Sequence, residues 1–220
     1  MMKRRGSALF FLAIALAAPG ASRADFLTIP NPDAAYLAST TKLEVTGDQF
    51  STLTSLSDGA LTVQFSTAME ILDVPDGWTT WSSPPQSESD TPRVLWTQGP
   101  SQVTLNFSSG LSTFGFEAQP DAFGAFGITA TFYSGADEVG SITRDVDGNS
   151  GALLFAGTVT AGTGPISRVV VSTAAGGFAI AQLRYAIGGT AVPEPSAVLL
   201  MATGLIGAGL VRLRRRVRLA

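Results

Sequence analysis

The chain has 220 residues and a formal net charge of −3, and its charges are unevenly distributed. The segment from Asp25 to Val192 holds five basic and 16 acidic residues, a net charge of −11, which argues against nucleic acid or anionic lipid as a partner because phosphate neutralisation needs clustered Lys and Arg. The sequence contains no Cys and no His, which excludes disulfides, His-activated nucleophiles and His-ligated zinc.

The first 24 residues have the three parts of a secretory signal peptide. Lys3, Arg4 and Arg5 form a basic start, residues 8–18 are an apolar core, and Ser22-Arg23-Ala24 is a small-x-small cleavage site. We therefore expect residues 1–24 to form a signal helix that engages the Sec translocon and is removed by signal peptidase.

The segment 25–190 is predicted to be one all-β domain. After an irregular stretch from Asp25 to Ala38, polar and apolar residues alternate with a period of two, and Asp58-Gly59 marks a hairpin turn. About ten short strands and no amphipathic helix predict an antiparallel two-sheet sandwich of jelly-roll or lectin-like type. The predicted strands are residues 42–46, 61–65, 94–97, 102–107, 113–118, 126–133, 138–143, 152–156, 166–173 and 178–185.

A long irregular stretch, residues 78–93, carries two tryptophans among polar residues. Trp78 and Trp81, together with Tyr133 on a later strand, could stack on sugar rings and form a carbohydrate-binding groove. The alternative is that the indoles hold the loop against the sandwich, because an indole buries a large area and keeps one donor for a partner.

Asp145, Asp147 and Asn149 place oxygen ligands at alternate positions beside Gly148, as in the first half of a calcium loop. The twelfth position is Ala156 rather than Glu, so the alternative is a polar turn between strands. A weak calcium site is the only cofactor that the sequence suggests.

Carboxylates are the remaining candidates for catalysis. A glycoside hydrolase needs two of them facing each other across a cleft, about 5 to 10 Å apart. Glu70, Asp73, Glu117 and Asp121 are available, but no local pattern selects a pair. We therefore predict a protein that is not an enzyme.

The C-terminal segment has three parts in a fixed order. Residues 192–196 are Val192, Pro193, Glu194, Pro195 and Ser196; residues 197–211 are uncharged, and the tail 212–220 carries Arg212, Arg214, Arg215, Arg216 and Arg218. As a helix, residues 197–211 would be roughly 22 Å long, short for a hydrocarbon core of about 30 Å. The arginines favour the cytoplasmic side of the membrane.

This order, over residues 191–220, resembles the PEP-CTERM sorting signal of Gram-negative bacteria. The resemblance implies recognition at Pro-Glu-Pro by an exosortase, transient residence in the inner membrane, and removal of the helix and basic tail. It also implies a final place at the cell surface or in the extracellular matrix, in association with exopolysaccharide or biofilm. The alternative is a membrane anchor that stays.

A second resemblance lies in residues 113–117, 154–157, 166–171 and 177–185, which are similar to the β-sandwich ectodomain common among PEP-CTERM proteins. Many of those proteins have Asp-Asn where this chain has Ala181-Gln182. We predict an exported, non-catalytic surface or matrix protein; the alternatives are a carbohydrate-binding module, a carboxylate-based hydrolase, and an adhesin that self-associates through exposed sheet edges.

Overall fold

A computed structural model describes residues 26–149, 151–160 and 163–188. These residues form eleven β-strands and one short helix, so the predicted all-β, antiparallel class is confirmed. In chain order the elements are β1 (Phe26–Ile29), α1 (Ala34–Ser39), β2 (Thr41–Lys42), β3 (Thr52–Ser57), β4 (Thr62–Asp73), β5 (Arg93–Trp96), β6 (Gln102–Pro120), β7 (Ala125–Ser134), β8 (Asp137–Asp147), β9 (Leu153–Val159), β10 (Ile166–Thr173) and β11 (Phe178–Ile187).

The predicted signal helix and the predicted transmembrane helix, residues 197–211, lie outside the described residues. Within those residues, no helix is long and apolar enough to cross a membrane.

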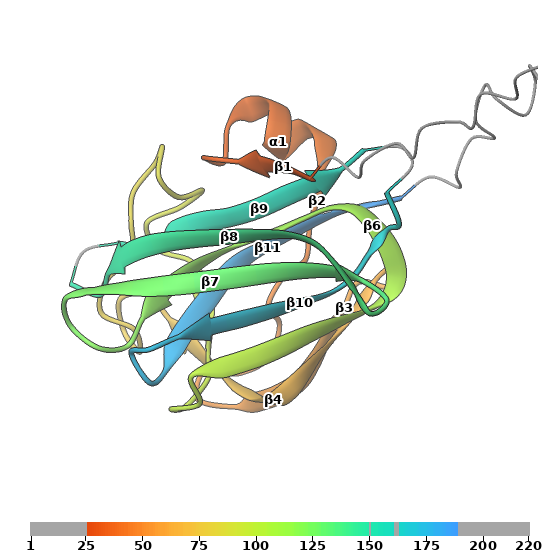
Figure 1. Cartoon of the computed structure of the whole chain (residues 1–220). Helices are drawn as coiled ribbons and strands as arrows, with labels where there is room; N and C mark the ends of the chain where they lie inside the picture. The colour runs from red at the N-terminus through yellow and green to blue at the C-terminus, as the bar shows by residue number, and fades with distance from the viewer. Residues whose placement is uncertain (1–25, 150, 161–162, 189–220) are drawn as a thin grey trace, which may run out of the picture.

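The strands form two layers that share the long strand β6 (Figure 1). The first part of β6 pairs with β4 and β10 in a layer of order β3-β4-β6-β10-β7-β8. Its second part pairs with β9 and β11, and this layer also contains β1 and β2. Strand β5 joins the two layers, because it pairs with β4 of the first and β11 of the second. The sandwich is thus one continuous antiparallel sheet folded on itself.

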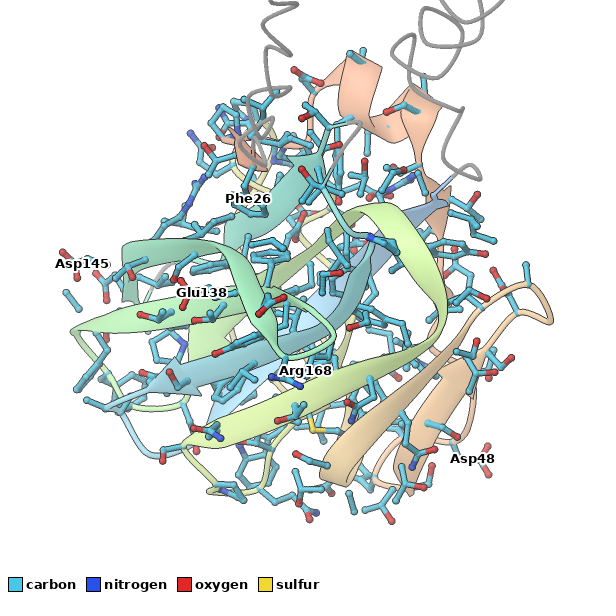
Figure 2. The ribbon with its side chains drawn as sticks, turned by 45° about the vertical axis from the view of Figure 1, so that its right-hand side comes forward. Phe26, Asp48, Glu138, Asp145 and Arg168 are labelled. Atoms are coloured by element: carbon cyan, nitrogen blue, oxygen red, sulfur yellow. The ribbon has the colours of Figure 1, made fainter. Side chains whose placement is uncertain are left out.

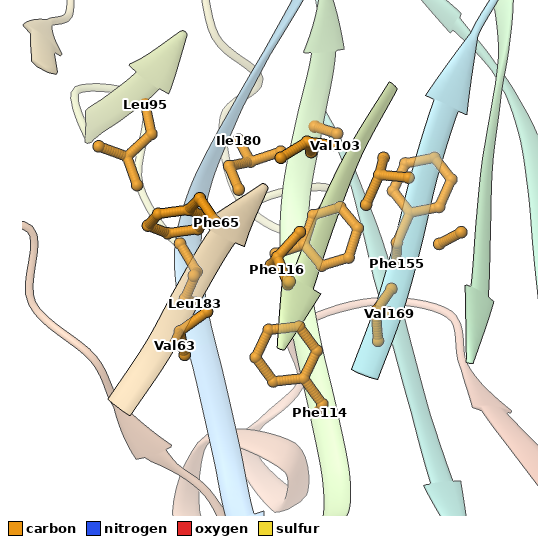
Figure 3. Close-up of a cluster of buried hydrophobic side chains, with 14 of the residues drawn as sticks. Val63, Phe65, Leu95, Val103, Phe114, Phe116, Phe155, Val169, Ile180 and Leu183 are labelled. Carbon is orange, nitrogen blue, oxygen red and sulfur yellow. The ribbon is translucent and has the colours of Figure 1, made fainter. Parts of the chain in front are cut away.

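The main core lies between the two layers (Figure 3). Phe114 and Phe116 of β6 contact each other at a ring-centroid distance of 6.0 Å, and Phe116 stacks on Phe155 of β9 at 5.8 Å. Phe26 of β1 meets Phe132 of β7 at 4.9 Å, across the two layers. Because the chain has no disulfides, these buried aromatic and aliphatic side chains provide most of the stabilisation.

A second buried region covers the outer face of β6. Every residue from Phe114 to Pro120 is buried, although alternate side chains of a strand point to opposite faces. Phe114 and Phe116 belong to the main core, whereas Glu117 and Gln119 meet the irregular segment between β4 and β5, and Gly115 meets Tyr36 of α1. Residues 74–92 and α1 therefore form a partial third layer.

Several local predictions differ from the structure. The stretch expected to be irregular, residues 25–38, contains β1 and most of α1, whose first turn is capped by Asp33 accepting a hydrogen bond from the Tyr36 amide at 2.8 Å. Of the strand predicted at 42–46, only Lys42 is in a strand. The hairpin at Asp58-Gly59 joins β4 to the Ser- and Thr-rich strand β3, which the hydrophobic pattern missed because it is mostly exposed. The two strands predicted at 102–107 and 113–118 are one strand, β6.

The position of β1 depends on two glycines. A Cβ atom at Gly157 of β9 or at Gly140 of β8 would collide with the Phe26 ring. We expect Gly157→Ala to lower the free energy of unfolding by about 1 to 3 kcal/mol, as overpacking does elsewhere, measured by urea denaturation. Gly127→Ala is the matched control, because a Cβ at this strand glycine makes only an ordinary contact with Asp145 at 3.7 Å. Equal stability of the two variants would contradict the role given to Gly157.

Candidate functional site

The two tryptophans of the 78–93 stretch lie against the outer face of β6. Trp78 donates its indole N–H to Gln119 Oε1 at 3.0 Å, and Trp81 donates to Glu117 Oε2 at 2.8 Å. The two side chains belong to residues that are only 9% and 7% exposed, and they pack with small residues such as Ala181. Both indoles are thus in the anchoring arrangement, and sugar stacking on them would require the loop to open.

Glu117 is the central polar residue of this anchor. It is fully buried, and its second oxygen, Oε1, accepts the Glu88 backbone N–H at 2.5 Å. Burial raises the pKa of Glu117 from 4.5 to about 7, against the lowering effect of the hydrogen bond from Trp81. The carboxyl group therefore ties two points of the loop to β6.

Gln119 has the same role two residues along the strand. Its oxygen accepts from Trp78, while its nitrogen donates to Thr80 Oγ1 at 2.8 Å and to the Gly148 carbonyl at 3.0 Å. A buried amide with all these partners is satisfied and holds the loop in one place.

An ion-pair cluster fixes the other end of the loop. Glu88 accepts from Arg184 at 2.7 and 3.0 Å, and Lys42 lies 3.6 Å from the same carboxylate. Burial raises the pKa of Glu88, but the hydrogen bond and charge of Arg184 outweigh it and hold this pKa below its ordinary value. Arg184 also donates to the carbonyls of Leu37 and Thr40, so it joins β11, the loop and the end of α1.

A pocket of about 170 Å³ opens beside this cluster. One wall comes from β2 and the residues after it, the other from the segment leading into β5, and Gln182 of β11 completes the lining. The lining residues are Lys42, Leu43, Glu44, Val45, Ser89, Thr91, Pro92, Arg93 and Gln182.

Gln182 has an unusual backbone. Its φ is 51°, in the left-handed region that favours glycine, and it lies where the pairing of β11 with β6 shifts between Ala181 and Arg184. The bulge separates Ala181, which packs under the tryptophan loop, from Gln182, which faces the pocket. Bulges of this kind redirect a side chain and occur often beside binding sites.

Tyr133 lies apart from the tryptophans. It is on β7, in the other layer, where the Arg168 guanidinium of β10 lies 4.2 Å from the centre of its ring. Figure 2 labels Arg168. The three aromatic residues proposed for sugar stacking therefore do not share one surface.

The residues proposed for calcium form a turn at the end of β8. Asp147 Oδ1 accepts from the Asn149 backbone N–H at 2.9 Å and from its side-chain amide at 2.8 Å. Asp145 is exposed at the outer margin of the fold (Figure 2). Across the described ranges, no group of three or more acidic residues is arranged to hold a metal ion.

The four carboxylates considered for hydrolysis are held in separate settings. Glu70 accepts from Gln98 at 2.9 Å, Asp73 from Arg93 at 2.7 Å, and Glu117 is buried under the loop. Asp121 is exposed in the turn after β6.

Sequence reasoning missed the Glu88–Arg184 pair and the orientation of Gln182. Glu88 and Arg184 are 96 positions apart, and no local pattern links them. The bulge at Gln182 follows from the pairing register of two distant strands, so the sequence of β11 alone carries no signal for it.

The comparison with family models supports the reading of the C-terminal segment. A model described as the PEP-CTERM protein-sorting motif matches residues 191–216, which include the motif 192–196, the apolar run and four of the five tail arginines, Arg218 being the exception. The chain thus carries a PEP-CTERM sorting motif, as predicted. These residues lie outside the described part of the structure.

The comparison with curated proteins returned no match. Among solved structures, the family 29 carbohydrate-binding module from Piromyces equi is similar at 13% identity and a TM-score of 0.32, over 76% of this chain and 93% of that one. The enzymatically active domain of tailspike protein 4 from bacteriophage CBA120 is similar at 16% identity and a TM-score of 0.27, over 69% and 20%. The CBM22-1–GH10 modules of xylanase 10B from Clostridium thermocellum are similar at 10% identity and a TM-score of 0.32, over 69% and 30%.

Proposed function

We propose that this chain is a precursor that an exosortase processes, and that the mature protein is a non-catalytic component of the cell surface or extracellular matrix. The observation that carries the proposal is the PEP-CTERM sorting motif at residues 191–216, which points to export and to an exosortase as the processing partner. The basic and apolar pattern of residues 1–24 adds a signal for entry into the Sec pathway.

The properties of the delivered domain support a binding or structural role. It is strongly acidic and has no Cys or His, and its buried carboxyl group, Glu117, serves to anchor a loop. We propose that this domain associates with extracellular polysaccharide, in which a net charge of −11 keeps the protein dispersed through mutual repulsion.

The processing step is tested by the intact mass of the protein recovered from the envelope and the medium of its host. The expected mass lacks the signal peptide and the residues that follow the Pro-Glu-Pro motif. In a host without exosortase, and in the Glu194→Ala variant, the C-terminal residues are expected to remain. Glu138→Ala changes an exposed glutamate of β8 and is the matched control, expected to be processed normally. A mass that is the same with and without exosortase would instead establish a permanent anchor.

The polysaccharide association is tested separately, by fractionating the host matrix. The processed protein is expected to sediment with the polysaccharide and to be released when the polysaccharide is degraded. Recovery of all the protein in the polysaccharide-free fraction would remove this part of the proposal and leave the processing result intact.

A further inference from the structure

We propose that the pocket at Gln182 is a binding site for a single neutral sugar residue, through its hydroxyl groups. The inference rests on the proposed association with polysaccharide and gives it a location. It moves the sugar site away from Trp78, Trp81 and Tyr133.

The Gln182 amide is available to a ligand. Gln182 is only 6% exposed, it lines the pocket, and its side chain makes no hydrogen bond to another described residue. The buried amide of Gln119, by contrast, has three partners. Both polar atoms of the Gln182 amide are thus free to bond a ligand in the pocket, whose hydroxyl groups can donate as well as accept.

The backbone conformation of Gln182 also favours a role for its side chain. At φ 51° glycine would be less strained, and glycine is the usual residue at the left-handed position of a bulge. Residues that the surrounding structure holds in such conformations cluster at active sites and ligand-binding positions. The side chain at position 182 faces the pocket, so binding a ligand there is a use that the structure makes available.

The chemistry of the pocket lining fits a neutral ligand that carries hydroxyl groups. Lys42 and Arg93 are balanced by Glu44 and by the partner of Arg93, Asp73, which leaves the pocket without a net charge to select an ion. Ser89 and Thr91 add hydroxyl groups that can both donate and accept, as the adjacent hydroxyls of a sugar require. Val45 and Pro92 provide apolar contacts for the C–H face of a ring.

The size of the pocket suits one sugar ring. Its volume of about 170 Å³ is many times the roughly 10 to 15 Å³ that a cavity needs to hold one water molecule. The pocket thus fits one sugar residue, at an end or a bend of a polysaccharide that continues into solvent.

The test uses the mature protein purified from its host and four methyl glycosides as probes: those of glucose, galactose, mannose and N-acetylglucosamine. Binding is measured by saturation-transfer-difference NMR at millimolar concentrations, with sodium glucuronate as an anionic probe. We expect at least one neutral glycoside to bind with a dissociation constant in the millimolar range.

Gln182→Gly is the decisive variant, because glycine accepts the backbone conformation and removes only the amide side chain. We expect binding at least about tenfold weaker, and unchanged or higher thermal stability. Thr91→Val, which removes one hydroxyl at nearly constant volume, is expected to weaken binding in the same direction. Gln98→Gly is the matched control, since Gln98 also has a positive φ, of 57°, but lies outside the pocket and bonds Glu70.

Three outcomes would overturn the inference: no binding of any neutral glycoside to the unmodified protein, binding unchanged in Gln182→Gly, or a preference for glucuronate over all neutral probes. None of them affects the processing result, which the mass measurement decides. If the unmodified protein and Gln182→Gly both sediment with the host polysaccharide, the association stands and the site lies elsewhere.

Discussion

Replacing Trp81 with alanine is expected to lower the free energy of unfolding by about 3 to 5 kcal/mol, the range seen when a buried tryptophan or phenylalanine is truncated. The indole is buried between the loop and the outer face of β6, so its removal leaves a cavity. It also removes the donor that Glu117 Oε2 accepts from at 2.8 Å. A buried carboxyl oxygen without a donor adds to the loss.

The phenylalanine variant separates these two effects. Trp81→Phe keeps most of the ring volume and removes the N–H, so we expect a smaller loss of about 1 to 3 kcal/mol in urea denaturation followed by circular dichroism. Trp96→Phe is the matched control, because the Trp96 indole N–H is buried and has no hydrogen-bond partner within the described residues. If Trp81→Phe and Trp96→Phe have equal effects, the bond to Glu117 contributes nothing to stability.

The stability of the folded domain is expected to fall as the pH rises from about 4.5 to about 7. Burial raises the pKa of Glu117 to about 7, above its ordinary value of 4.5. Between these values the folded protein keeps a proton that the unfolded chain has released, so the unfolded state binds fewer protons and gains on the folded state as the pH increases. The largest change for this one group is about 3 kcal/mol, complete above about pH 7.

Unfolding free energies measured at intervals between pH 4.5 and pH 8 test this expectation. Glu117→Gln removes the titrating group and is expected to flatten the profile in this range. Glu88, whose pKa lies below its ordinary value, acts in the opposite sense: its contribution is present above about pH 4.5 and is lost at lower pH. An identical slope in the Glu117→Gln variant would assign the pH dependence to another group.

The contacts that hold the tryptophan loop also affect the proposed sugar site. Glu88 lies next to Ser89, which lines the Gln182 pocket, and Lys42 belongs both to the ion-pair cluster and to the pocket wall. The contacts that hold the loop down thus also fix one wall of the pocket. The Trp81→Phe variant, in which the loop is less firmly held, offers a further way to examine glycoside binding.

The sequence by itself determined the sorting signal and the fold class of this protein. The sorting motif is a contiguous run of a proline-containing motif, an apolar segment and a basic tail, and such a linear signal is read without any tertiary contact. The all-β class followed from the period-two alternation in strands such as residues 126–133, because burial of one sheet face imposes this period locally.

Only the tertiary structure decided the roles of the individual polar and aromatic residues. Trp81 could have been a sugar platform or an anchor, and the choice depended on Glu117, which lies 36 positions away in β6. Whether Gln182 faces a pocket depended on a bulge set by the register between β11 and β6. Contacts between residues so far apart leave no periodic trace in either segment, because each segment records only which of its own residues are buried.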